Sequence, residues 1–191
     1  EAFGPRPDIV VSGPNLGLNT GRSVLHSGTV GAALAAQNFG MRGLAVSLAV
    51  SEEWHFDTAC QYAIELLKAL ANGPERCALN LNVPALPYAQ TKGLRWGGLA
   101  EFGSVRSQIV DQAEGQLFFD LVETEYDPPA DSDLGLVNAG FAAVTSLQCS
   151  AEVWSANLAS NTDYQATSPM PAASSGDVLK AAQVFSPTTQ N

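Results

Sequence analysis

Short apolar runs alternate with helix-forming segments in the first part of the chain, and this order restricts the fold more than any other feature. The runs cover 8–12, 44–50 and 78–83, and the helical patterns lie between them, at 27–39 and 57–72. Strands that alternate with helices are typical of parallel sheets joined by right-handed crossovers. The first run is rich in β-branched residues, so we expect a strand buried on both faces. The sequence therefore predicts an α/β fold, a Rossmann-like parallel sheet with helices on both faces.

The pattern changes after Pro87, where helix signals give way to strand-like segments. These segments cover 93–99, 116–126 and 134–147, and the last two flank a stretch rich in proline and aspartate. Strand patterning favours contacts between copies of a chain, and Trp96, Phe118 and Phe119 offer aromatic anchors for them. We therefore expect a β-rich C-terminal hairpin region that is used in homo-oligomer contacts.

The chain divides into three parts on this basis. Residues 1–92 form a partial α/β core whose first strands are missing, and 93–150 form a β-rich region that completes the core and makes the oligomer contacts. Residues 151–191, in which Ser, Thr, Ala, Pro and Asn dominate, form a C-terminal tail or arm. A content of 46% hydrophobic residues is enough to bury a core.

The charge balance narrows the class of partner. The chain has 9 basic and 19 acidic residues, a formal net charge of −10. This charge repels a phosphate backbone, so we expect neither a nucleic-acid polymer nor an anionic membrane as partner. The 3 cysteines lack CxxC spacing and do not predict a zinc site. A small anionic substrate would need a metal ion or backbone amides to hold it.

A loop rich in glycine and asparagine, 13–22, leaves the carboxyl end of the first predicted strand. Ligands of parallel sheets bind at that edge. Asn15 and Asn19 offer neutral side-chain oxygens there, and such oxygens are suitable ligands for magnesium or manganese. The loop is therefore a candidate metal site.

Ser27, Gly28 and Thr29 stand at the start of the first predicted helix. They put hydroxyl groups and free backbone amides at a helix N-terminus, where the helix dipole favours an anion. A candidate anion site thus lies a few residues from the candidate metal site. The alternative stays open, because Asn and Gly also form ordinary turns and Ser also caps helices without any ligand.

Three further polar residues have competing interpretations. His26, next to the predicted cap, could act as a general acid or base, but a single histidine there is more often a surface or packed residue. Asp131 and Asp133 could bind a metal, although aspartate is also a common turn residue.

An ordered set of motifs covers the chain from Arg6 to about Leu147. The motif SGPN, ending at Asn15, is followed by SGTV from Ser27 and by LNLNVP ending at Pro84. This set resembles the SurE family of stationary-phase survival proteins. The resemblance implies that the chain belongs with 5′/3′-nucleotidases. These enzymes hydrolyse nucleoside monophosphates and, more broadly, other phosphomonoesters in the manner of an acid phosphatase.

The resemblance also implies a divalent metal, Mg²⁺ or Mn²⁺, and a phosphate site. In the family, two adjacent aspartates after the first strand, a serine and the asparagine of SGxN hold the metal. Only Asn15 matches this set, so the main catalytic carboxylates would lie upstream of this chain. The phosphate would be bound by Asn19, Ser27, Gly28 and Thr29.

Two functions follow from these observations. The first is a metal-dependent nucleotidase, present here as an N-terminally incomplete chain that is nearly inactive alone. The alternative is a non-catalytic SurE-like remnant that acts as an oligomerisation or interaction module. The family implies a homodimer or tetramer and a cytoplasmic location, while the Ser/Thr-rich tail and the cysteines would also suit an exported branch.

Overall fold

A five-stranded sheet forms the centre of the protein, in the order β1-β2-β3-β7-β4. The computed structural model describes residues 4–113 and 115–148. The predicted tail, 151–191, lies outside the described residues, so the division into three parts stays a prediction. The strands are β1 (Ile9–Leu16), β2 (Arg42–Leu48), β3 (Ala78–Val83), β4 (Leu94–Trp96) and β7 (Ala142–Leu147).

The prediction of an α/β fold is confirmed, with one refinement of the sheet. Strands β1, β2 and β3 are parallel, whereas β7 runs antiparallel to β3 and β4 runs parallel to β7. The sheet is therefore mixed. An apolar run such as 142–147 predicts a strand but carries no information about the direction of its neighbour.

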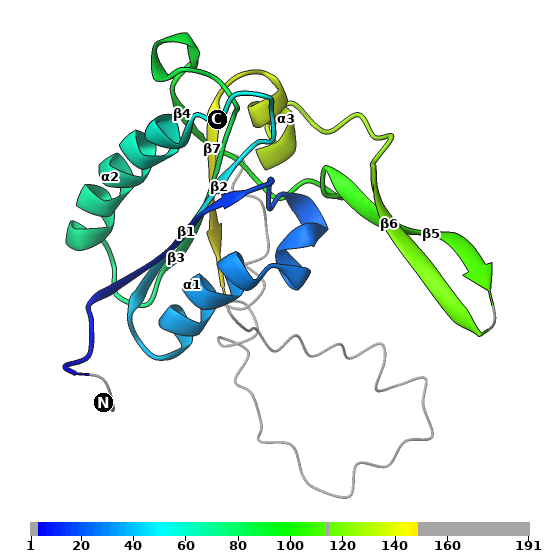
Figure 1. Cartoon of the computed structure of the whole chain (residues 1–191). Coiled ribbons are helices and arrows are strands. Elements are labelled where there is room, and N and C mark those ends of the chain that lie inside the picture. Colours follow the sequence, from blue (N-terminus) through cyan, green and yellow to red (C-terminus); the bar gives the residue numbers. More distant parts are fainter. Residues whose placement is uncertain (1–3, 114, 149–191) are drawn as a thin grey trace, which may run out of the picture. The chain divides into compact units, whose positions relative to one another are not determined.

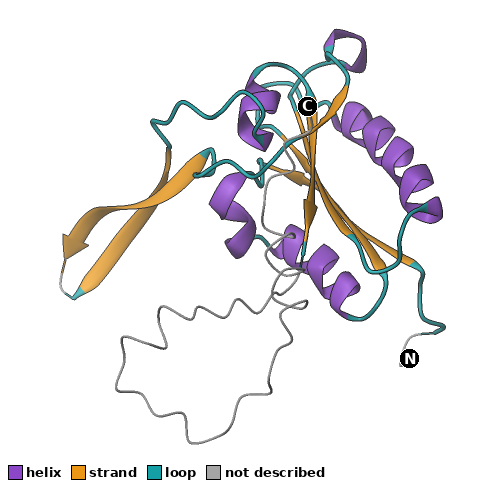
Figure 2. Ribbon diagram, turned by 180° about the vertical axis from the view of Figure 1, so that it is seen from behind, coloured by secondary structure: helices purple, strands orange, loops and turns teal. Residues whose placement is uncertain are grey.

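Helices cover both faces of the sheet, as Figures 1 and 2 show. Helix α1 (Gly28–Asn38) lies on one face and α2 (Phe56–Asn72) on the other. Ser27 caps α1, because its side-chain oxygen accepts a hydrogen bond of 3.1 Å from the backbone N–H of Val30. Gly40, with φ 78°, follows the end of this helix in the left-handed region. Both features agree with the sequence prediction.

The two faces of the sheet differ in polarity, and β3 shows this most clearly. Its sequence alternates Leu and Asn, and its odd-numbered residues form part of the apolar core that α2 covers. Asn80 and Asn82 face the other side, where the strand register aligns them with Ala45 and Ser47 of β2. Both asparagines are completely buried. A buried polar row therefore lies on the same face as α1.

Strand β1 lies at the edge of the described sheet and pairs there with β2. The expectation of a strand buried on both faces is therefore wrong for β1. Val11, for example, leaves 46% of its surface exposed. Branched side chains alone do not separate an edge strand from a central one, because β propensity depends on the neighbours that pack against the strand.

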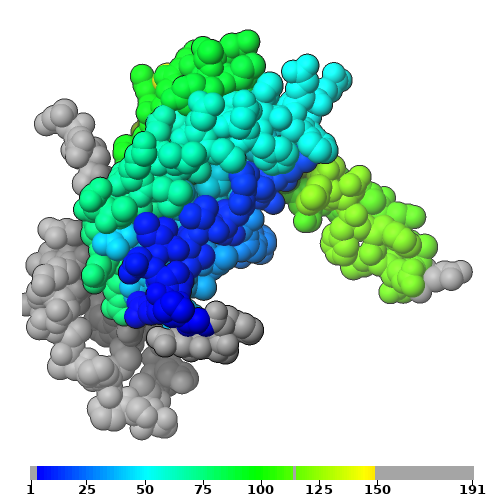
Figure 3. All heavy atoms as spheres, turned by 60° about the vertical axis from the view of Figure 1, so that its left-hand side comes forward, coloured from blue at the N-terminus to red at the C-terminus, as the bar shows by residue number. Residues whose placement is uncertain are grey.

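A separate two-stranded antiparallel hairpin consists of β5 (Val105–Ala113) and β6 (Gln116–Glu123). It extends away from the sheet, as Figures 1 and 3 show. Every residue of β5 is exposed. The predicted hairpin region is thus present, but it is shorter than expected, because β4 and β7 belong to the main sheet.

The segment 134–147 is not a single strand, contrary to the sequence prediction. Its first part belongs to helix α3 (Asp133–Asn138), and only β7 is a strand. The Ser132 side chain caps α3 by accepting a hydrogen bond of 3.1 Å from the backbone N–H of Gly135. Gly140, with φ 91°, then allows the turn into β7. No helix among the described residues is long and apolar enough to cross a membrane.

Candidate functional site

The loop after β1 lies at the carboxyl ends of the parallel strands, as the sequence predicts. Asn15 occupies the end of β1 and pairs in register with Ser47 of β2. The backbone N–H of Gly17 then donates to the carbonyl of Leu48, the last residue of β2, at 2.8 Å. This edge therefore carries the loop directly over the buried polar row.

Asn19 is the centre of a buried hydrogen-bond network at this edge. Its backbone N–H donates to Oδ1 of Asn82 at 2.8 Å, and its side-chain Nδ2 donates to Oγ of Ser47 at 2.7 Å. The carbonyl of Asn19 accepts from the side chains of Asn80 at 2.8 Å and Asn82 at 3.1 Å. The polar row thus fixes the backbone of the loop, and the side-chain amide of Asn19 is partly committed to Ser47.

Asp133 holds the same loop, although it lies 112 residues beyond Gly21 in the sequence. Its Oδ2 accepts a hydrogen bond of 2.9 Å from the N–H of Gly21, and its Oδ1 accepts bonds of 2.8 Å from the N–H groups of Ala100 and Leu134. Burial raises the pKa of this completely buried carboxyl group, and the backbone N–H groups oppose that rise. Asp133 therefore joins three separate segments around one carboxylate.

Gly21 shows how closely these segments approach one another. It has φ 53°, in the left-handed region, and a Cβ atom there would lie 2.3 Å from the backbone oxygen of Phe102. A side chain at this position would push the loop away from residues 100–102. The contact between the two segments therefore depends on glycine.

The start of α1 is the place at which the sequence predicts an anion site. The backbone N–H groups of Gly28 and Thr29 have no hydrogen-bond acceptor within the described residues. A Cβ atom added at Gly28 would meet no atom within 4 Å, so the space beside its Cα is open. Free amides at the start of a helix favour an anion.

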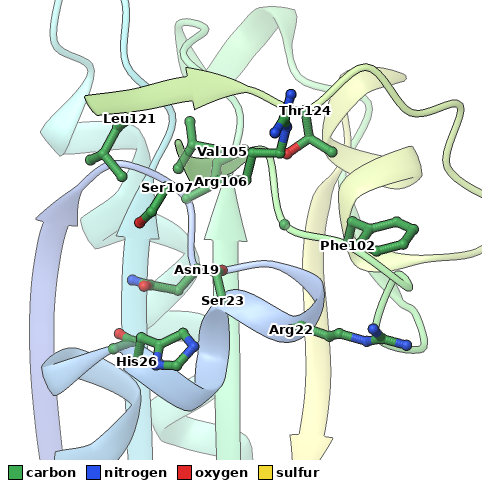
Figure 4. A pocket seen from close by; sticks show the side chains of 13 residues that line it. Asn19, Arg22, Ser23, His26, Phe102, Val105, Arg106, Ser107, Leu121 and Thr124 are labelled. Carbon is green, nitrogen blue, oxygen red and sulfur yellow. The ribbon is translucent and has the colours of Figure 1, made fainter. Parts of the chain in front are cut away.

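A pocket of about 550 Å³ lies between this loop and the β5–β6 hairpin. Asn19 and Ser27 line it, whereas Asn15, Gly28 and Thr29 lie outside its lining. Figure 4 shows Asn19 and His26 on one side and Val105, Ser107 and Leu121 of the hairpin on the other. The remaining lining residues are Leu18, Arg22, Ser23, Phe102, Gly103, Arg106 and Thr124.

The two formally charged side chains that line the pocket are both basic, although the chain has a net charge of −10. They are Arg22 and Arg106. Arg22 also contacts Glu101 at 3.6 Å and lies over the ring of Phe102, with 5.2 Å from its guanidinium carbon to the ring centre. This local excess of positive charge suits an anionic ligand.

Sequence reasoning missed Arg22, Phe102 and Arg106 as lining residues. Arg22 belongs to the loop that the sequence singles out, but an arginine at the end of a glycine-rich loop carries no specific signal. Phe102 and Arg106 come from a segment that follows β4 and have no motif around them. Only the folded chain brings them to the pocket.

Asn15 fits the role of one metal ligand. Its side-chain Nδ2 donates to the carbonyl of Gly17 at 2.8 Å, which leaves Oδ1 without a hydrogen bond inside the described part of the chain. The described residues contain no group of three or more His, Cys, Asp or Glu side chains that could hold a metal. Asp133 is occupied by backbone N–H groups. A complete metal site would need ligands beyond those described.

Comparisons with known proteins agree with the motifs. The family model described as survival protein SurE matches residues 1–105. A protein of Yersinia pestis (strain Pestoides F) named 5′/3′-nucleotidase SurE is 40% identical over 149 residues, which cover 75% of this chain and 58% of the relative. A protein of the same name from Yersinia pseudotuberculosis serotype O:1b (strain IP 31758) is 39% identical over the same shares.

The solved structure of the SurE protein from Aquifex aeolicus has the same fold, with a TM-score of 0.64 and 26% sequence identity. The match covers 76% of this chain and 61% of that protein. The chain thus spans 58% of the length of the curated relatives named above. Because the family model matches more than half of the 191 residues, the chain belongs to the SurE family.

Proposed function

We propose that this protein acts as a metal-dependent 5′/3′-nucleotidase that hydrolyses nucleoside monophosphates and other phosphomonoesters. The observation that carries the proposal is the basic pocket beside the free amides of α1 and the uncommitted oxygen of Asn15. Membership of the SurE family supports it, since the Yersinia relatives are named nucleotidases. A cytoplasmic location stays a prediction.

In this proposal the chain's own residues bind and orient the phosphate. The N–H groups of Gly28 and Thr29, together with the helix dipole, stabilise negative charge on the phosphoryl oxygens. Arg106 adds positive charge from the pocket wall, which His26 also lines. The network around Asn19 holds the loop in place on the sheet before the phosphate arrives.

A divalent ion, Mg²⁺ or Mn²⁺, would polarise the phosphoryl group and lower the pKa of a bound water when present. Asn15 would supply one neutral oxygen ligand. One such oxygen cannot hold an ion that loses its water reluctantly, so carboxylate ligands from outside the described residues are required.

The test is phosphate release from adenosine 5′-monophosphate in the presence of Mn²⁺. It compares this chain with a version preceded by the aspartate-pair strand that the SurE resemblance implies. Strong activity is expected only in the longer version, and Asn15→Ala should lower its kcat/KM by about a hundredfold. Asn138→Ala, an exposed asparagine at the end of α3, is the matched control and should have no effect.

Equal activity of the shorter and longer versions would contradict this assignment of the ligands. Asp131 and His26 would then be the first residues to test as alternatives.

The non-catalytic alternative is favoured by the exposed apolar surface of the hairpin. Ile109, Phe118 and Phe119 leave 52%, 46% and 62% of their surfaces exposed. A two-stranded hairpin is barely stable alone in water, so a partner surface would stabilise it. An interaction module would use this surface without turnover in either version of the chain.

We expect the protein to form a homodimer or tetramer through the hairpin, whichever function holds. Multi-angle light scattering should give a multiple of the 20.0 kDa chain mass. Replacing Ile109 and Phe119 with serine removes apolar contact area and should shift the mass toward that of one chain. A monomer at high concentration before any substitution would refute this expectation.

A further inference from the structure

The pocket has two unlike walls. The loop side is polar and is formed by Asn19, Ser23, His26 and Ser27. The opposite side carries apolar side chains from residue 102 and from the hairpin, together with Arg106, Ser107 and Thr124. A phosphate ion would use only the polar and basic groups, since apolar surface contributes nothing to binding an anion.

Strand pairing explains why apolar side chains of the hairpin face the pocket. Ser107 of β5 lies opposite Leu121 of β6, and Val105 is two residues from Ser107 on the same face. All three line the pocket. Val105 is 41% exposed and Leu121 is 68% exposed, so their side chains are free to contact a ligand.

Phe102 completes the apolar side and is held in place by neighbours. Arg22 lies over its ring at 5.2 Å, and the ring of Tyr126 meets it in an edge-to-face arrangement, with the ring centres 5.2 Å apart. Phe102 is still 40% exposed. An oriented, partly exposed aromatic ring is a suitable contact for another flat ring.

We propose that Phe102, Val105 and Leu121 bind the organic group of the substrate and thereby select phosphomonoesters that carry a nucleoside. This inference rests on the proposed function. The volume of about 550 Å³ lies within the roughly 300–1,000 Å³ of small-molecule pockets and exceeds what a phosphate ion needs. The phosphate lies toward Ser27 and the nucleoside lies against the hairpin. The hairpin is then a specificity element as well as a surface for other copies.

The test measures equilibrium binding of adenosine 5′-monophosphate, adenosine and inorganic phosphate by calorimetry, without added metal. Leu121→Ser is compared with Leu117→Ser on the same chain. Leu117 lies on the same strand and is 49% exposed, but it does not line the pocket. The two variants therefore carry the same chemical change at comparable exposure.

Leu121→Ser should weaken the binding of adenosine 5′-monophosphate and of adenosine by about fivefold to tenfold, the effect of losing roughly 40–60 Å² of apolar contact. It should leave the affinity for inorganic phosphate unchanged. Leu117→Ser should change none of the three affinities. Urea unfolding of both variants checks that the fold is kept.

Equal effects of the two substitutions would overturn the inference, as would an adenosine 5′-monophosphate affinity no higher than that of phosphate. A change of mass in light scattering with Leu121→Ser alone, without a change in binding, would assign Leu121 to contacts between copies and would also overturn it. Failure of the proposed function looks different, because phosphate would then not bind while adenosine still did. If no probe binds, both proposals are wrong.

Discussion

Replacing Asp133 with alanine is expected to lower the free energy of unfolding by about 3–5 kcal/mol, the largest effect that we predict. The substitution leaves three backbone N–H groups, from Gly21, Ala100 and Leu134, without their acceptor in a completely buried place. Each such group costs about 1–3 kcal/mol when it stays unpaired. Urea unfolding followed by circular dichroism measures the loss.

Two further substitutions separate the role of the carboxylate from a general sensitivity of the segment. Asp133→Asn keeps one acceptor oxygen but sets an amide donor against another N–H donor, so a smaller loss of about 1–3 kcal/mol is expected. Asp131→Ala changes an exposed aspartate two residues earlier and should alter stability by about 0.5 kcal/mol at most. Similar losses for all three variants would contradict the anchoring role of Asp133.

The pH dependence of the loss follows from the raised pKa of Asp133. Because burial raises the pKa in the folded state, the folded protein binds this proton more tightly than the unfolded chain. The stability from Asp133 is therefore complete below the ordinary carboxyl pKa and decreases as pH rises through the raised value. The cost of Asp133→Asn should accordingly be larger at about pH 4 than at about pH 7.

Asn82→Ala is expected to lower stability by about 2–4 kcal/mol and to weaken phosphate binding as well. The side chain of Asn82 both accepts from the backbone N–H of Asn19 at 2.8 Å and donates to its carbonyl at 3.1 Å. Alanine leaves that N–H buried without an acceptor and opens a small cavity. The loop that carries the site then loses both of its hydrogen bonds to Asn82.

Asn80→Ala is the matched comparison, on the same strand and the same face. Asn80 donates to the carbonyl of Asn19, but that carbonyl keeps its bond from Asn82 when Asn80 is removed. The loss should be about half that of Asn82→Ala. Urea unfolding and phosphate calorimetry give both quantities, and a larger loss for Asn80→Ala would show that the network is organised differently.

The elements that sequence predicts best are those with strong local signals. The cap at Ser27 and the left-handed Gly40 mark both ends of α1, because each depends on residues within one helical turn. Helix α3 escaped prediction because it is only 6 residues long and carries too few periodic positions to distinguish it from a strand. The direction and order of the strands in the sheet depend on pairing between segments that are far apart in the sequence. Short stretches of sequence therefore carry no signal for them.

The candidate site likewise has a part that the sequence predicts and a part that it does not. The positions of the loop, of Asn15 and of the start of α1 could be predicted because these residues are contiguous in sequence and follow a strand, and their binding roles stay predictions. The carboxylate of Asp133 could not be assigned from sequence, because its partners Gly21 and Ala100 are far from it along the chain. The pocket wall at Phe102 and Leu121 also depends on how the hairpin meets the loop.

The alternation of leucine and asparagine in β3 has a consequence for how the chain finds its correct fold. Shifting β3 by one residue against its neighbours would turn Asn80 and Asn82 toward α2 and would bring Leu79 and Leu81 beneath Asn19. Such a misaligned sheet would bury unpaired amides among leucines and would leave the loop without hydrogen-bond partners. The asparagines that hold the site therefore also disfavour wrong strand alignments. Selection for the site and selection for a single strand alignment thus act on the same residues.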